Sequence, residues 1–277
     1  MPLTKLQSQI LRLLAAHRSP ESFVAGSIPL NRDRARYSGD IDIFNDIPER
    51  MVPIVSADVD VLRAAGYMVT LSEPRNLYIQ RGVIEAGGES SEIDWVIDSD
   101  FRFFPAVPDE FFGYVLHPID LAVNKASAAS SRRVPRDIVD LVAIDAEILP
   151  LGAVLCAAVG RFPGPTPEGM LDDISRQSNF SPPEYAGLKM ERPLDIADTY
   201  KKIKIMIERA RDYVSTMPSD ALGAVFLKDG VPVQPDPARL SDYIRHEGSR
   251  RGHWPSSSEI GSAMLERYAE RKPLSKG

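Results

Sequence analysis

The chain has 277 residues, is 43% hydrophobic, and carries 33 Lys and Arg against 39 Asp and Glu, a net charge of −6. This composition excludes a disordered chain, and the lone Cys156 excludes a disulfide framework and a cysteine-based zinc site. Because the N-terminus lacks the features of a signal peptide and no run of about 18 apolar residues occurs, we expect a cytoplasmic protein without a membrane association.

The first half of the chain is predicted to hold most of the β-structure. The expected elements are a helix over 3–17, a short strand or helix end at 23–25, a β-rich stretch at 41–44, a helix over 58–65, and strands at 67–72, 77–81 and 91–98. The last two strands are joined through Gly87-Gly88.

From Pro118 onward the hydrophobic periodicity becomes helical. The expected elements are helices around 118–126, 135–144, 151–159 and 193–214, a hairpin over 224–234, and final helices at about 238–246 and 257–271. The Pro- and Gly-rich segment from Arg161 to Gly169 is expected to separate a domain at 1–160 from a mainly helical domain at 161–277. The fold class is therefore α+β.

Charge is unevenly distributed along the chain. Residues 1–150 hold 15 basic and 22 acidic side chains, whereas residues 201–277 hold 14 basic and 10 acidic ones. This difference has two interpretations. It reflects the ordinary scatter of surface charge, or the N-terminal half binds cations and the C-terminal half binds phosphates. The net charge of −6 therefore does not exclude a nucleic-acid partner.

The most informative stretch is residues 23–46, where Gly26-Ser27 is followed after twelve residues by Asp40-Ile41-Asp42-Ile43. On a strand, Asp40 and Asp42 project from one face while the isoleucines are buried behind them. Two adjacent carboxylates repel each other unless a cation lies between them, and Mg²⁺ prefers one or two carboxylates together with phosphate oxygens. A Gly-Ser turn offers an approachable backbone and a hydroxyl to a phosphate. The alternative is a pair of solvated acids on an edge strand.

A third carboxylate is expected on the strand at 91–98. Alternation places Glu92, Asp94 and Asp98 on one face of that strand. Asp94 is central and is the preferred candidate, with Glu92 as the alternative; a solvated surface acid is the other interpretation.

The conjunction of Gly-Ser, spacing and Asp-hydrophobe-Asp resembles the nucleotidyltransferase signature of the DNA polymerase beta superfamily. More narrowly, Arg36-x-Ser38-x-Asp40-Ile41-Asp42 resembles the AbiEii-type nucleotidyltransferase toxins of type IV toxin–antitoxin systems. Their downstream motifs resemble Asp120-Leu121-x-x-x-Lys125 and Arg133-x-x-Arg136-Asp137-Ile138-Val139-Asp140-Leu141. The resemblance spans about residues 21–145, and it departs where the family's Gly-Gly-Thr-Ala-Leu is replaced by Gly26-Ser27-Ile28-Pro29-Leu30.

This resemblance implies a small mixed β-sheet nucleotidyltransferase core flanked by helices. It also implies roles for nine residues: Asp40, Asp42 and Asp94 as ligands of Mg²⁺ or Mn²⁺, Gly26, Ser27, Arg36 and Ser38 as nucleotide contacts, Lys125 as a cation that binds the phosphates or neutralises the leaving group, and Asp137 as the residue that orients Lys125 or a nucleotide group. The NTP is the implied substrate. The implied acceptor is RNA, with the tRNA 3′ end favoured, and the implied partner is a separately encoded antitoxin.

Two alternatives stay open at this point: the same chemistry on a small-molecule or protein hydroxyl, and a catalytically inactive member that binds a nucleotide or a partner protein. Three basic groups are candidates for contacting an RNA backbone, although solvated helix faces explain them equally well. These groups are Arg132-Arg133, Lys201-Lys202-x-Lys204 and Arg250-Arg251 with Trp254 nearby.

Overall fold

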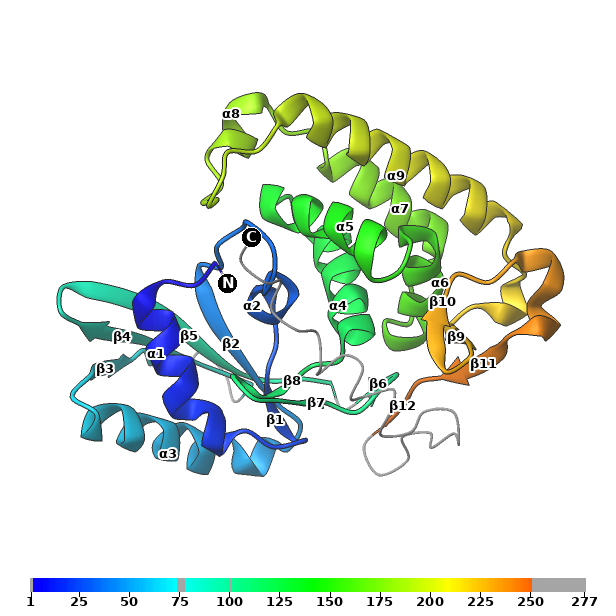
Figure 1. The fold of residues 1–277 in the computed structure, drawn as a ribbon. Coiled ribbons are helices and arrows are strands. Elements are labelled where there is room, and N and C mark those ends of the chain that lie inside the picture. Colours follow the sequence, from blue (N-terminus) through cyan, green and yellow to red (C-terminus); the bar gives the residue numbers. More distant parts are fainter. Residues whose placement is uncertain (1, 74–77, 100, 251–277) are drawn as a thin grey trace. The chain divides into compact units, whose positions relative to one another are not determined.

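The fold is given by a computed structural model that describes residues 2–73, 78–99 and 101–250 (Figure 1). These residues form two compact units. The first unit contains the described residues up to 99 together with 105–117, and the second contains 101–104 and 118–250. The predicted helix at 257–271, Arg251 and Trp254 lie outside the described residues.

The first unit is built on a seven-stranded mixed sheet with strand order β3-β4-β5-β2-β1-β8-β7. Its strands are β1 (Ser22–Val24), β2 (Asp40–Asn45), β3 (Met68–Leu71), β4 (Ile79–Ala86), β5 (Glu89–Ile97), β7 (Val107–Asp109) and β8 (Gly113–Val115). The central strands β2 and β5 run parallel to each other, and β1 and β4 flank them in antiparallel orientation.

One face of this sheet is covered by α1 (Lys5–Leu14) and α3 (Met51–Ala64) (Figure 1). Helix α1 begins with a capping box between Thr4 and Gln7. The apolar faces of both helices join one buried cluster with Ile41 and Ile43 of β2 and with the neighbouring residues of β5. Because strand side chains alternate between faces, burial of these isoleucines turns the intervening side chains of β2 to the opposite face.

A buried ionic network lies under the helix-covered face. The Asp58 carboxylate on α3 accepts hydrogen bonds from Arg18 at 2.5 and 2.6 Å and from Trp95 Nε1 at 2.8 Å, and it contacts His17 Nδ1 at 2.9 Å. Burial lowers the pKa of Arg18 from its usual value, while Asp58 stabilises the charged form. Because Trp95 belongs to β5, the network ties α3 to the centre of the sheet.

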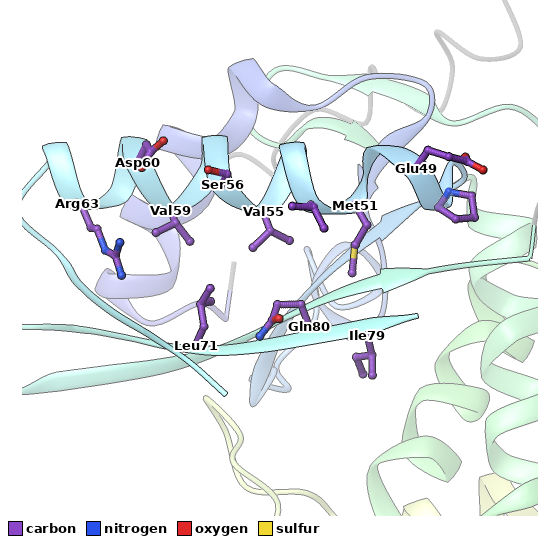
Figure 2. Close-up of a pocket in the computed structure, with 12 residues that line it drawn as sticks. Glu49, Met51, Val55, Ser56, Val59, Asp60, Arg63, Leu71, Ile79 and Gln80 are labelled. Atoms are coloured by element: carbon purple, nitrogen blue, oxygen red, sulfur yellow. The ribbon is translucent and has the colours of Figure 1, made fainter. Parts of the chain in front are cut away.

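A groove of about 580 Å³ lies between α3 and the hairpin formed by β3 and β4 (Figure 2). Met51, Val55 and Val59 line it from α3, and Leu71 and Gln80 line it from the hairpin. Gln80 pairs with Trp95 in the sheet, so the groove belongs to the helix-covered face. None of the nine sequence-predicted site residues lines it.

The second unit is mainly helical. Its helices are α4 (Pro118–Ser131), α5 (Pro135–Glu147), α6 (Leu151–Arg161), α7 (Pro167–Gln177), α8 (Pro182–Ala186) and α9 (Ile196–Thr216). Its strands are β6 (Phe101–Arg102), β9 (Ala224–Lys228), β10 (Val231–Val233), β11 (Ile244–Glu247) and β12 (Ser249–Arg250). In the described ranges no single helix is long and apolar enough to cross a membrane; α5 and α6 reach such a length only together, across a bend of 110°.

The predicted mixed sheet with flanking helices is confirmed, and the hairpin turning at Asp229-Gly230 is present as β9 and β10. The helix predicted at 238–246 is wrong. A 3-10 segment, Pro237–Asp242, leads there into β11, because residues 244–247 pair with β9 and complete a three-stranded sheet. The predicted domain boundary at 160/161 falls inside the second unit, since α4 packs against both α6 and α7.

Candidate active site

The predicted carboxylates project from the sheet face opposite α1 and α3. The parallel register of β2 and β5 places Asp42 beside Asp94 and Asp40 beside Glu92. Neighbouring strands lie about 4.8 Å apart, so these side chains stand close together. The three aspartates are half-buried, whereas Glu92 is exposed. Asp94, the preferred third carboxylate, is therefore the one that adjoins Asp42.

Charge and burial act together on Asp94. Burial raises the pKa of Asp94 above its usual value, the Arg81 guanidinium on β4 opposes this increase, and the negative charges of Asp40 and Glu92 add to it. Arg81 Nε lies 3.3 Å from Asp94 Oδ2. A cation placed among these carboxylates would relieve their mutual repulsion, so the cluster favours cation binding.

The Gly26-Ser27 turn lies against Asp42. The Ala25 amide donates to the Asp42 carbonyl oxygen at 2.9 Å, and Gly26 has a φ of 66°. A Cβ on Gly26 would lie only 1.8 Å from Asp42 Oδ2. Glycine is therefore required because the Asp42 carboxylate occupies the space that a side chain would need. Ser27 follows as the buried first residue of α2 (Ser27–Leu30).

Gly26, Asp42, Asp94 and Arg81 form a line across four adjacent strands, which we call the cross-strand row. Their order follows the strand order β1, β2, β5 and β4, with Gly26 two residues beyond the end of β1. The row places the turn at one end, the carboxylates in the middle and a cation at the other end.

Arg36 and Ser38 lie in the loop before β2, and both are buried. The Ser38 hydroxyl donates to the Asp40 carbonyl oxygen at 3.1 Å and lies 3.5 Å from Asp40 Oδ1. Gln7 Nε2 donates to the Ser38 carbonyl oxygen at 3.2 Å, and one Arg36 guanidinium nitrogen donates to the Tyr37 carbonyl oxygen at 2.9 Å. Ser38 can therefore orient Asp40. The nucleotide contacts expected of Arg36 and Ser38 stay predictions.

The donor set suits a hard divalent cation. Asp40, Asp42 and Asp94 offer only carboxylate oxygens, which are the ligands that Mg²⁺ and Mn²⁺ prefer. Within the described ranges, no three His, Cys, Asp or Glu side chains are gathered closely enough to hold a metal ion by themselves. Mg²⁺ sites commonly use one or two carboxylates and complete the coordination with water and substrate phosphates. The residues present therefore fit a metal that binds together with a nucleotide.

Of the two partners expected for Asp137, Lys125 contacts it in the second unit. Lys125 Nζ lies 2.8 Å from Asp137 Oδ1 and 3.0 Å from Asp140 Oδ2, and Arg132 Nε donates to Asp137 Oδ2 at 2.8 Å. Burial alone would raise the pKa of Asp137, but the hydrogen bonds and charges of Arg132 and Lys125 outweigh burial and hold it below its usual value. Asp140 and Arg132 are thus partners that the motif alone did not assign.

Several cations that were candidates for an RNA contact have acidic partners in the second unit. Arg132 pairs with Asp137, and Arg133 pairs with Glu184 and lies 4.1 Å over the ring of Phe180. On α9, the partners of Lys202 and Lys204 are Asp198 and Glu208 at i,i+4 spacing. These cations are paired in the structure, and their contact with RNA stays a prediction.

Asp120, the first residue of the downstream lysine motif, binds the backbone amides of the segment 101–104. Its fully buried carboxylate accepts hydrogen bonds from the amides of Phe103 and Phe104 at 2.9 and 3.1 Å. Burial raises the pKa of Asp120 to about 6, against the hydrogen bonds and the charges of Arg161 and Arg102. Asp120 therefore stabilises the segment 101–104 inside the second unit.

This raised pKa predicts a pH-dependent stability. Because the folded state holds the proton of Asp120 more tightly than the unfolded state, the contribution is full below about pH 4 and is lost as the pH rises to about 6. The difference in unfolding free energy between wild type and Asp120→Asn should fall by up to about 3 kcal/mol over this interval. Urea denaturation of both proteins at each pH measures it, and a constant difference would contradict the expected titration.

Arg81 is the residue of the cross-strand row that the sequence reasoning missed. The two-residue turn Gly87-Gly88 carries the signal, because counting back along both strands from this turn pairs Arg81 with Asp94. The strand predicted at 77–81 ends before this turn, whereas β4 continues to Ala86, so the predicted strand gives no register with 91–98.

Comparison with known proteins supports the fold. No protein-family model and no curated protein sequence matches this chain. Among solved structures, MenT4, a nucleotidyltransferase toxin from Mycobacterium tuberculosis, superposes with a TM-score of 0.54 and 14% identity, covering 78% of this chain and 83% of MenT4. A protein from H. pylori assigned as a nucleotidyltransferase gives a TM-score of 0.44 and 14% identity, covering 76% of this chain and 94% of that one. The chain therefore has the fold of the nucleotidyltransferase MenT4.

Proposed function

We propose that this chain is a metal-dependent nucleotidyltransferase that transfers NMP from an NTP to an acceptor hydroxyl. The observation that carries this proposal is the position of Asp42 beside Asp94 across the parallel strands β2 and β5, next to the turn at Gly26. The fold that the chain shares with MenT4 supports the same chemistry.

The carboxylates supply the binding site for the metal and a base. Asp40, Asp42 and Asp94 would hold one or two Mg²⁺ or Mn²⁺ ions, which when bound neutralise phosphate charge and acidify the attacking hydroxyl. The acceptor oxygen forms a bond to the α-phosphorus while the bond from this phosphorus to the bridging oxygen breaks and pyrophosphate leaves. Asp94 is the residue proposed to receive the hydroxyl proton, because it lies beside Asp42 at the end of the carboxylate group that is further from Gly26.

The other predicted residues position the nucleotide. The Gly26-Ser27 turn would receive the phosphate tail at its end of the cross-strand row, and Ser38 would keep Asp40 oriented toward the site. Lys125 would neutralise phosphate charge, with Asp137 fixing the direction of its ammonium group. A point-like ammonium suits this task.

The proposed acceptor is RNA, with the tRNA 3′ end favoured, and the proposed biological role is that of a cytoplasmic toxin restrained by an antitoxin protein. Two observations support this role. The motifs around Asp40 and Lys125 resemble those of AbiEii-type toxins, and MenT4 is itself described as a toxin.

The test is incubation of the purified protein with each labelled NTP, Mg²⁺ and total tRNA. We expect wild type to label tRNA and Asp40→Ala to be slower by about 10³-fold, because loss of a metal ligand removes several kcal/mol of transition-state stabilisation. Asp60→Ala, which removes an exposed acid from α3 on the other face, should retain the wild-type rate.

Two outcomes would contradict the proposed chemistry: no labelling by wild type in any fraction, or equal labelling by wild type and Asp40→Ala. Label in protein or small-molecule fractions, with tRNA unlabelled, would keep the chemistry and reassign the acceptor.

A further inference from the structure

Arg81 is a cation beside the carboxylates whose role the proposed reaction does not yet explain. Its backbone is fixed in the sheet, because the Arg81 carbonyl oxygen accepts hydrogen bonds from the Ser72 amide at 3.0 Å and from Gln80 Nε2 at 2.9 Å. The side chain, in contrast, is 57% exposed and meets Asp94 through Nε at 3.3 Å. A rigid strand therefore presents a largely solvent-accessible guanidinium beside the site.

The position of Arg81 in the cross-strand row separates it from the phosphate end. Gly26 follows β1, whereas Arg81 lies on β4, which is three strands further along the sheet. With a spacing of about 4.8 Å between strands, the two ends of the row lie about 14 Å apart. Asp42 and Asp94 fill the interval between them. A phosphate tail at the Gly26-Ser27 turn is therefore far from the Arg81 backbone.

The geometry of phosphoryl transfer assigns the two ends of the row to different substrates. The attacking and leaving oxygens lie roughly in line on opposite sides of the phosphorus. If the leaving phosphates lie toward Gly26, the attacking hydroxyl approaches from the side of Asp94, and Arg81 lies one strand beyond Asp94 on that side. Arg81 therefore belongs to the acceptor's side of the reaction centre.

Guanidinium groups recognise phosphates through a planar fork of donors. The closest contact of Arg81 with Asp94 is through Nε, and a guanidinium carries five N–H donors, more than a pairing with one carboxylate uses. A polynucleotide acceptor brings a backbone phosphate close to its terminal hydroxyl, whereas a serine, threonine or tyrosine hydroxyl of a protein brings none. A cation on the acceptor's side is thus expected for a polynucleotide.

We propose that Arg81 binds a backbone phosphate of a polynucleotide acceptor and positions its terminal hydroxyl at Asp94. The proposal rests on the proposed function and assigns a residue of the same site to recognition of the acceptor. Arg81 is a specificity-determining residue in this view, and its pairing with Asp94 in the absence of substrate keeps the guanidinium beside the place where the acceptor enters.

The test measures initial rates of label transfer at varied total tRNA and at varied NTP for wild type, Arg81→Ala and Arg81→Lys. Loss of one charged phosphate contact should raise the KM for tRNA in Arg81→Ala by about tenfold or more and leave the KM for NTP within about twofold of wild type. The dependence of log KM for tRNA on log salt should become shallower by about 0.7 to 1. Arg81→Lys, which keeps the charge without the fork, should recover part of the tRNA affinity.

Arg63→Ala is the matched control, because it removes an exposed arginine of the same unit from α3 on the opposite face. It should leave both KM values unchanged. If Arg81→Ala lowers kcat alone, Arg81 only holds Asp94, and if it raises the KM for NTP alone, Arg81 contacts the nucleotide; either result overturns the proposal. An unchanged Arg81→Ala enzyme overturns it as well while leaving the proposed function intact, whereas no transfer by wild type overturns both.

Discussion

Replacing Gly26 with alanine is expected to lower nucleotidyl transfer by about 10²-fold or more and to destabilise the first unit by about 2–4 kcal/mol. Two separate effects contribute to this result. The φ of 66° is unfavourable for any residue with a Cβ, and the new methyl carbon would lie 1.8 Å from Asp42 Oδ2. Since the glycine backbone is held by the neighbouring strand, the Asp42 carboxylate must move, and the proposed metal site loses its geometry.

Gly66→Ala separates these two effects. Gly66 also has a positive φ, of 87°, but a Cβ built on it has no atom within 4 Å. This variant should show the backbone cost of about 1–3 kcal/mol and keep wild-type activity. Urea denaturation and the labelled-NTP assay, applied to both variants, give the comparison. Full activity in Gly26→Ala would show that Asp42 does not act from its position against Gly26.

The sequence predicts correctly those elements and site residues that depend on a pattern within one short segment. Asp40 and Asp42 follow from alternation within one strand, and the hairpin at Asp229-Gly230 follows from its turn residues. The choice between Asp94 and Glu92 is different, because it depends on the register between β2 and β5, which are separated by about fifty residues and joined by no short turn. A pattern within one strand cannot supply that register.

At residues 238–246 the local pattern predicted the wrong element. Their composition permitted a helix, yet Ile244–Glu247 gain hydrogen bonds as a strand because β9 offers an edge for pairing. Such a tertiary partner overrides local propensity.

The pairing of Asp137 with Lys125 was expected from the motif, but Asp140 and Arg132 completed the network only through the packing of α4 against α5.

The second large effect is expected at Asp58, on the covered face of the sheet. Asp58→Ala should destabilise the protein by about 3–5 kcal/mol, because it leaves the buried Arg18 guanidinium without its counter-charge. Trp95 Nε1 would lose its 2.8 Å hydrogen bond in the same variant. The midpoint of urea denaturation measures the loss. The stability of Asp58→Asn, which keeps a hydrogen-bond acceptor, should lie between those of wild type and Asp58→Ala. If the alanine variant does not accumulate, the comparison of Asp58→Asn with wild type gives the test.

The matched control is Glu21→Ala, which breaks an ion pair with Arg50 whose side chains are 35% and 62% exposed. Water screens that pair, so its loss should cost no more than about 1 kcal/mol. An equal loss of unfolding free energy in Asp58→Ala and Glu21→Ala would contradict the claim that burial makes the Asp58 ion pair the more important of the two.

A double variant, Arg18→Met with Asp58→Leu, distinguishes loss of the pair from loss of one partner. Replacing both charges by apolar groups should recover most of the stability lost in Asp58→Ala, because no charge is then left buried alone. Its activity is informative as well. Trp95 follows Asp94 on β5 and is held by Asp58, so a stable double variant with reduced kcat would show that the network also positions Asp94. Retained activity would show that strand pairing with β2 and β4 is sufficient to hold Asp94 in place.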